Sequence, residues 1–124
     1  ANLHFLNLHK CPEVGNAAVA RVSRSAASNL TTLSLGECGR ISDQGVCEIA
    51  DNCTNLETLD LSRPHGLYLK ELEQCITDDG IHALLSEGAC TSLTKLNLDR
   101  CTKLEGACFS DVPVMPSITS VSMR

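Results

Sequence analysis

The sequence predicts an α/β fold in which copies of one strand–helix unit are stacked. The template Leu-x-x-Leu-x-Leu recurs along the chain, and its first positions lie 27, 26, 37 and 25 residues apart. This regularity indicates one repeated supersecondary unit, with an insertion of about ten residues in the third copy. The copies are Leu3/Leu6/Leu8, Leu30/Leu33/Leu35, Leu56/Leu59/Leu61, Leu93/Leu96/Leu98 and the weaker Ile118/Val121/Met123.

Each template is expected to form a short strand, because its apolar residues alternate at a period of two and a polar turn follows. In the second copy, Gly36 and Gly39 end the strand. The leucines would then face a core, and the residues between them would point away from it.

A helix is predicted after each of the first three strands. Ser42 or Asp43 can accept hydrogen bonds from the free backbone N–H groups at a helix start. The same pattern returns at residues 76–81, and Asn16 replaces the aspartate in the first copy. Two prolines that follow the fourth template remove backbone donors, so a short or irregular turn is expected there. The expected buried helix faces are Val46, Ile49, Ala50 and Cys53 in the second copy, and Ile81, Leu84 and Leu85 in the third.

Residues 33–46 (LSLGECGRISDQGV) and 53–61 (CTNLETLDL), with a close copy at 90–101, resemble the cysteine-containing class of leucine-rich repeats. That class is found in F-box proteins and related intracellular adaptors. The resemblance implies a right-handed solenoid, a β-α superhelix with parallel strands on its concave face and helices on its convex face. Pro64 departs from the pattern, which has cysteine at this position.

A single domain is expected over residues 1–124, and its third repeat contains the insertion at 65–74. This segment holds the only tyrosine, Tyr68, and three leucines. Tolerated loop growth, which costs little entropy, is the favoured interpretation, and docking on the rim as a short helical turn is the alternative. Neither end carries a polar cap, so flanking repeats of a longer chain are expected. The repeats are about 2–28, 29–54, 55–91, 92–116 and a partial 117–124.

Five of the eight cysteines fall in two repeat columns. Cys11, Cys38 and Cys101 follow the third leucine by three residues, and Cys53 and Cys90 precede the first by three. Other copies have apolar residues there, so we interpret these thiols as buried core groups rather than a secreted disulfide framework. Neighbouring strands lie about 4.8 Å apart, which makes a Cys11–Cys38 disulfide sterically possible. We nevertheless predict reduced thiols and a cytoplasmic location.

No pattern of catalytic or metal-ligating residues is evident. There is no Cys-x-x-Cys pair, and the four histidines fall on different faces of the expected elements. Buried thiols lack the exposed, electropositive setting that activates a nucleophile. Asp78 and Asp79 begin a helix, where interaction with the helix dipole explains them better than acid catalysis. We therefore predict a non-enzyme with no catalytic residue, no metal and no cofactor.

Composition narrows the class of partner. A formal charge of −5 and an isoelectric point near 5.2 disfavour nucleic acids and anionic membranes, because phosphate binding needs clustered Lys and Arg. No apolar run reaches the roughly 18 residues that span a bilayer. Stacked repeats instead make one long continuous surface, which usually holds another protein.

The concave face is the predicted binding surface, since residues between the leucines point there. Arg63 and Arg100, beside Asp60 and Asp99, are the expected anchors because arginine forms bidentate contacts with carboxylates. The alternative is that these side chains are polar only because a strand facing water needs them. The full predicted set is Phe5, His9, Glu37, Glu57, Asp60, Arg63, Tyr68, Lys95, Asn97, Asp99 and Arg100.

Three functions fit this pattern. The first is an intracellular protein-interaction module, for which the resemblance suggests substrate recognition in a ubiquitin-ligase adaptor. The second is a structural scaffold in a cytoskeletal or axonemal assembly, with contacts through the helices and loops. The third is a regulatory inhibitor that clasps an enzyme.

Overall fold

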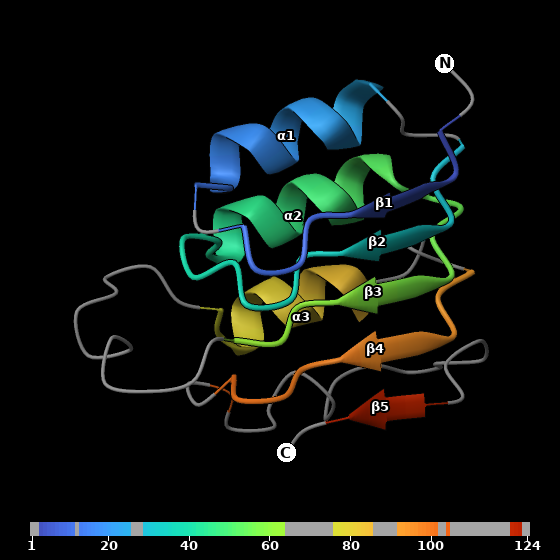
Figure 1. Cartoon of the computed structure of the whole chain (residues 1–124). Coiled ribbons are helices and arrows are strands. Elements are labelled where there is room, and N and C mark those ends of the chain that lie inside the picture. Colours follow the sequence, from blue (N-terminus) through green and yellow to red (C-terminus); the bar gives the residue numbers. More distant parts are fainter. Residues whose placement is uncertain are drawn as a thin grey trace.

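Strands and helices alternate along the first three repeats of the chain (Figure 1). The computed structural model describes residues 3–11, 13–25, 29–63, 76–85, 92–101, 104 and 120–122. The elements in chain order are β1 (Phe5–Asn7), α1 (Asn16–Ser25), β2 (Thr32–Ser34), α2 (Asp43–Asn52), β3 (Thr58–Asp60), α3 (Asp78–Leu85), β4 (Lys95–Asn97) and β5 (Ser120–Ser122).

The five strands form one parallel sheet whose strand order is the chain order. The central residues of the templates pair directly: Leu6 with Leu33, Leu33 with Leu59, Leu59 with Leu96, and Leu96 with Val121. The predicted equivalence of the five templates is therefore confirmed, and the chain has an α/β repeat fold. We call a strand, together with the turn and helix that follow it, a rung, and number the rungs one to five from β1 to β5.

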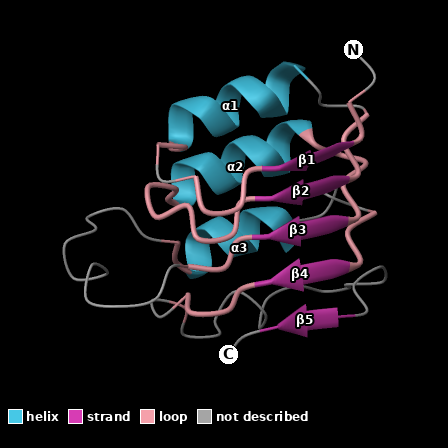
Figure 2. Ribbon diagram, in the orientation of Figure 1, coloured by secondary structure: helices cyan, strands magenta, loops and turns pink. Residues whose placement is uncertain are grey.

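The helices cover one face of the sheet. Figure 1 shows α1, α2 and α3 side by side behind the strands, with α1 packed on α2 and α2 packed on α3. Figure 2 shows the loops that leave the first four strands lying one below another. No helix of the described residues lies on the other side of the sheet, which we call the open face.

The core lies between the sheet and the helices. In rungs two to four, all nine leucines of the templates are at most 2% exposed. Burial of one leucine side chain contributes about 1.5–3 kcal/mol, so these leucines dominate the stability of the stack. The predicted faces of α2 and α3 are also confirmed as buried. The insertion at 65–74 and the expected irregular turn of the fourth repeat lie outside the described residues.

Rung one is less well covered than the rungs that follow it. Leu6 and Leu8 are only partly buried, and Leu3 is 41% exposed. The reason is that, in the described part of the chain, rung one has a neighbour on one side only. Each leucine of rung one therefore contributes less burial than its counterpart in rung two.

The starts of α2 and α3 receive capping bonds from the preceding rung, and at α3 the Thr77 hydroxyl also accepts the Asp79 backbone N–H at 3.3 Å. Ser42 is the N-cap of α2, but its side chain makes no capping bond. Asn16 Oδ1 instead accepts the backbone N–H groups of Ser42 and Gly45, both at 3.0 Å. Asp43 likewise accepts the backbone N–H of Thr77 at 2.7 Å, at the start of α3. The prediction that this helix starts at Ser42 or Asp43 is therefore confirmed, whereas the capping bond expected from the Ser42 side chain is wrong.

Glycine in the helix starts makes room for these capping side chains. A Cβ atom at Gly45 would lie 2.5 Å from Asn16 Oδ1, and one at Gly80 would overlap Asp43 Oδ1. Each Asn or Asp thus begins its own helix and also supplies an acceptor to the next one. This contact fixes the spacing of the helices, and through it the register of the turns that precede them.

Candidate functional site

The open face carries two regular columns of side chains. The first and third residues of each strand point there and are exposed or half-buried, while the middle residue of β2, β3 and β4 is buried. This alternation confirms that residues between the leucines point away from the core. The columns are Phe5, Thr32, Thr58, Lys95 and Ser120, and Asn7, Ser34, Asp60, Asn97 and Ser122.

Three strands, β1, β3 and β4, end in a tight polar turn built by their last side chain. Asn7 Oδ1 accepts the backbone N–H of His9, Asp60 Oδ1 that of Ser62, and Asn97 Oδ1 that of Asp99, each at 2.9 Å. Asparagine and aspartate favour such turns because their short side chains bond to the backbone two residues on. Asn97, a predicted binding residue, therefore has a structural task as well.

The next column adopts an unusual backbone conformation. Lys10, Glu37 and Arg100 have φ angles of 59°, 60° and 62°, a left-handed conformation that is uncommon for residues other than glycine. Arg63 occupies the same column but does not share this conformation. The backbone of this turn is therefore alike in rungs one, two and four and differs in rung three.

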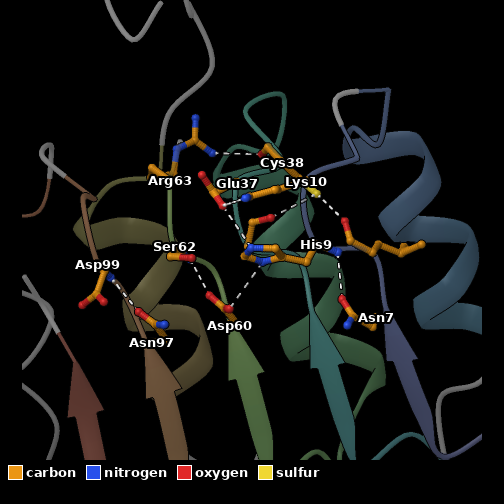
Figure 3. A network of polar contacts seen from close by, with 12 residues as sticks. Asn7, His9, Lys10, Glu37, Cys38, Asp60, Ser62, Arg63, Asn97 and Asp99 are labelled. Carbon is orange, nitrogen blue, oxygen red and sulfur yellow. Dashed lines mark hydrogen bonds and ion pairs between the residues drawn. The ribbon is translucent and has the colours of Figure 1, made fainter. Parts of the chain in front are cut away.

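Charged side chains of three rungs meet beyond the strand ends (Figure 3). His9 Nε2 lies 3.0 Å from Glu37 Oε2, and His9 Nδ1 lies 4.0 Å from Asp60 Oδ2. Lys10 Nζ lies 3.8 Å from the same Glu37 oxygen. We call His9, Lys10, Glu37 and Asp60 the turn cluster. It joins rungs one, two and three on the open face and includes three of the predicted binding residues.

Gly36 makes the turn cluster possible. The His9 ring lies over this glycine, where a Cβ atom would overlap Nδ1 and lie 2.8 Å from Asp60 Oδ2. Sequence reasoning assigned Gly36 only to ending the strand. Its place in the repeat register, in the column of His9, Ser62 and Asp99, was the signal that could have placed it on the open face.

The predicted exposed position of Arg63 is wrong. Arg63 is only 4% exposed, and its guanidinium points into the turn of rung two. Nη1 donates to the carbonyls of Ile41 at 2.8 Å and Cys38 at 3.4 Å, while Nη2 donates to that of Gly39 at 3.0 Å (Figure 3). Arg63 therefore stabilises a turn rather than contacting solvent.

Three carbonyls of the preceding turn account for this inward position. Those of Cys38, Gly39 and Ile41 accept from Arg63, and buried carbonyls need hydrogen-bond donors. The guanidinium carries five N–H donors in a planar fork and can serve several carbonyls at once. The neighbouring Ser62 is also buried, at 4% exposed.

Arg100 also bonds to the backbone. Its Nε donates to the Arg63 carbonyl at 2.7 Å, and the residue is half-buried. Its neighbour Asp99 accepts a hydrogen bond from the Ser122 hydroxyl at 2.5 Å. Arg100 therefore links rungs three and four, and of the two expected anchors Arg63 is buried while the binding role of Arg100 stays a prediction.

The other predicted binding residues are spread along the open face. Phe5, which is 60% exposed, and Lys95 share the first strand column, and Glu57 is exposed just before β3. These three lie at the opposite end of the strands from the turn cluster. Tyr68 lies outside the described residues.

The thiols of the turn column are buried and bonded to the preceding rung. Cys38 Sγ donates to the Leu8 carbonyl at 3.0 Å, and Cys101 Sγ to that of Leu61 at 3.5 Å. Burial raises the pKa of Cys38 and raises the pKa of Cys101 to about 11. Cys53 is fully buried, Cys11 is half-buried, and Cys90 lies outside the described residues. The interpretation as core thiols is confirmed for Cys38, Cys53 and Cys101.

A shallow groove of about 890 Å³ runs along α1 and α2 on the helix side. Two ion pairs connect neighbouring rungs beside it: Arg24 Nη2 lies 2.8 Å from Glu48 Oε1, and Arg40 Nη1 lies 3.5 Å from Glu13 Oε2. Exposed ion pairs of this kind contribute about 0–1 kcal/mol each. The helix side thus offers a second polar surface.

Within the described ranges, no three His, Cys, Asp or Glu side chains converge to hold a metal ion. None of the described helices is long and apolar enough to cross a bilayer.

Fold and site together define an α/β repeat protein with an unpartnered, polar sheet face. Residues 26–50, which include β2 and most of α2, match the model of the leucine-rich repeat family. This match supports a leucine-rich repeat assignment, and repeats of that family generally mediate protein–protein interaction. No curated protein matches the chain.

Proposed function

We propose that this chain is a protein-interaction module that holds a protein partner on its open face. The proposal extends the five parallel strands to a right-handed solenoid in which the open face is concave. It assigns the chain no catalytic role, no cofactor and an intracellular location.

The turn cluster is the observation that carries the proposal. Four charged or ionisable side chains from three rungs lie within 4.0 Å contacts of one another on an exposed face. The backbone of these rungs is fixed by the parallel sheet and by stacked turns, so little side-chain and loop entropy remains to be lost on binding. Charges that are already held in place contribute more to the choice of a partner with complementary charge than to the affinity for that partner.

Phe5 adds an apolar contact to this charged surface. It is the largest exposed hydrophobic side chain among the described residues, at 60%. Aromatic side chains are enriched at the centres of protein interfaces. We propose that a partner spans the face from Phe5 and Glu57 at one end of the strands to the turn cluster at the other.

Charge reversal on matched surfaces tests the proposal. Glu57→Lys changes an exposed residue of the open face, and Asp51→Lys makes the same change of charge at an exposed position of α2. Partners would be captured from cell extracts with the wild-type chain and identified by mass spectrometry, and their dissociation constants measured by calorimetry. A tenfold or greater loss of affinity is expected for Glu57→Lys alone. Equal affinity of wild type and Glu57→Lys, with a loss for Asp51→Lys, would move the binding surface to the helices.

The adaptor role is the specific form that we propose, and it rests on the likeness of residues 33–46, 53–61 and 90–101 to repeats of F-box proteins. Co-purification of the full-length protein with ubiquitin-ligase subunits would support it. A captured enzyme whose activity falls on binding would instead support an inhibitor.

A scaffold role is the second candidate, and the groove along α1 and α2 favours it. Three arginines and two glutamates line this groove, and Arg24 and Arg40 are paired with Glu48 and Glu13. Arg21 is the remaining cation of the lining, so a carboxylate on a helix of an assembly partner would fit it. Arg21→Glu, at an exposed position of α1, is expected to weaken such a contact and to leave binding at the open face unchanged.

A further inference from the structure

We propose that Cys11 and Cys38 form a redox-responsive pair that a peroxide converts into a disulfide between rungs one and two. The inference goes beyond the proposed function, because it concerns a covalent modification within the chain and needs no partner. In reducing surroundings the pair stays as two thiols.

The stacking of the turns brings the two residues to equivalent positions. The parallel register continues past the strands, since Leu8 N–H donates to the Ser34 carbonyl and Lys10 N–H to the Gly36 carbonyl, both at 2.8 Å. Each cysteine closes the same turn: Cys11 N–H donates to Leu8 O, and Cys38 N–H to Leu35 O, each at 3.2 Å. Strands in such register lie about 4.8 Å apart, within the Cα separation of about 4.4–6.8 Å that a disulfide needs.

The sulfur of Cys38 already reaches into the turn of Cys11. Its Sγ lies 3.0 Å from the Leu8 carbonyl oxygen, which also accepts the Cys11 N–H at 3.2 Å. Cys11 Sγ lies 3.8 Å from the His9 carbonyl. Both thiols thus lie around one hydrogen-bonded turn, and rotation of side chains is the movement required to join them.

The two thiols differ in solvent exposure, and this difference determines which of them the oxidant reaches first. Cys11 is half-buried, whereas Cys38 is 1% exposed. An oxidant from solvent therefore meets Cys11 first, and Cys38 is the resolving thiol. Burial raises the pKa of Cys38, which slows its direct attack on an oxidant at neutral pH.

The chemistry needs one peroxide for each disulfide. The Cys11 thiol loses its proton, the thiolate attacks a peroxide oxygen, and the O–O bond breaks to give a sulfenic acid and hydroxide. The hydroxide takes up the Cys11 proton and leaves as one water. Cys38 sulfur then attacks the Cys11 sulfur, an S–S bond forms, and the S–O bond breaks. The departing hydroxide takes the Cys38 proton and leaves as a second water. Two thiols lose two electrons, hydrogen peroxide gains them, and a thiol reductant reverses the bond by exchange.

The disulfide would act on the least buried part of the stack. Leu6 and Leu8 of rung one are only partly buried, while Leu33 and Leu35 of rung two are 1% and 2% exposed. A bond between Cys11 and Cys38 would hold rung one against rung two. It would also restrain the turn cluster, because Lys10 and Glu37 immediately precede the two cysteines.

Rung four supplies a matched control. Cys101 occupies the same column and also bonds to the preceding rung, at Leu61 O, but that rung has Pro64 in place of cysteine. A paired thiol and an unpaired thiol can therefore be compared in one molecule.

Peptide mapping of the native chain after hydrogen peroxide treatment and alkylation tests the pair. We expect a linked peptide that contains Cys11 and Cys38, that disappears with dithiothreitol, and that is absent from Cys11→Ser. Cys101 is expected to remain a free thiol. Amide hydrogen exchange in β1 is expected to slow at least about tenfold on oxidation.

The proposal fails if both cysteines are recovered as thiols or as sulfinic acids without a link, or if Cys11 links to other cysteines as often as to Cys38. Oxidation in denaturant is the reference for such unselective linking. Partner capture plays no part in this experiment, so its failure would leave the proposed binding function intact.

Discussion

Rungs two and three have equivalent strands but different turns. Leu33 of β2 pairs directly with Leu59 of β3, and each is 1% exposed. Past the strand, rung two places Glu37 in a left-handed conformation on the open face, whereas rung three turns Arg63 into the structure. The leucine pattern determines the strand, but the direction of the side chain in the turn depends on which hydrogen-bond acceptors lie around it.

Rungs one, two and four have a cysteine in the turn column, at Cys11, Cys38 and Cys101, whereas rung three has Pro64. A cysteine in the turn column supplies a backbone N–H and a thiol, as Cys38 does for Leu35 and Leu8. In rung three, the Arg63 guanidinium beside Pro64 bonds to other carbonyls of the preceding turn, those of Ile41 and Gly39. The open face consequently loses an arginine that the repeat pattern alone would place there.

The largest expected effect tests the equivalence of the two strands. Leu59→Asp places a carboxylate inside the stack and is expected to cost several kcal/mol, enough to unfold the chain. Leu33→Asp should do the same, because the two leucines are equally buried. Thr58→Asp, on the open face of the same strand, is the control and should melt close to the wild type by circular dichroism. Cooperative wild-type melting of Leu59→Asp would contradict the register.

Replacement of the two arginines sharpens the contrast between the turns. Arg63→Met removes the donors of three carbonyl contacts in a buried site and is expected to lower the free energy of unfolding by about 2–4 kcal/mol. Arg100→Met removes one bond from a half-buried residue, with an expected cost of about 1 kcal/mol. Denaturant unfolding measures both. Equal costs would contradict the structural role assigned to Arg63.

Much of the fold could be predicted because leucine periodicity is a strong and local signal. The strands, the buried faces of α2 and α3, and the buried thiols of the turn column all follow from it. The direction of Arg63 could not be predicted in this way, because a column position says where a side chain starts and not which acceptors surround it. The turn cluster was predicted only in part, since its assembly depends on Gly36 leaving space for the His9 ring.

Titration of the column thiol gives a further comparison of the turns. Burial raises the pKa of Cys101 from 9.0 to about 11, so between these values the folded chain holds a proton that the unfolded chain releases. The free energy of unfolding should therefore fall as the pH rises from about 9 to 11, by up to about 2–3 kcal/mol for this group. Cys101→Ala should show a shallower decline in denaturant unfolding across this range. Parallel slopes for the two proteins would exclude the buried thiol as a cause.

The smallest expected effect separates the helix starts from the turns that precede them. Asn16→Ala removes the acceptor shared by Ser42 and Gly45 and is expected to cost about 1 kcal/mol. Gly45→Ala alone should also destabilise, because its Cβ would lie 2.5 Å from Asn16 Oδ1. Once Asn16 is alanine that overlap is gone and only the contact with Ile41 Cγ2 at 3.2 Å remains, so Gly45→Ala should then cost about 1 kcal/mol less than in the wild-type background.

A double-mutant cycle measured by denaturant unfolding tests whether the effect of Gly45→Ala depends on the Asn16 side chain. The exposed neighbour Gln44 gives the control, since Gln44→Ala should have nearly the same small effect with and without Asn16. If the effects of Asn16→Ala and Gly45→Ala simply add, the two sites are independent and capping across rungs does not set helix spacing. A coupling of about 1 kcal/mol would instead show that glycine is required here by the side chain of the preceding rung, and not by the helix that contains it.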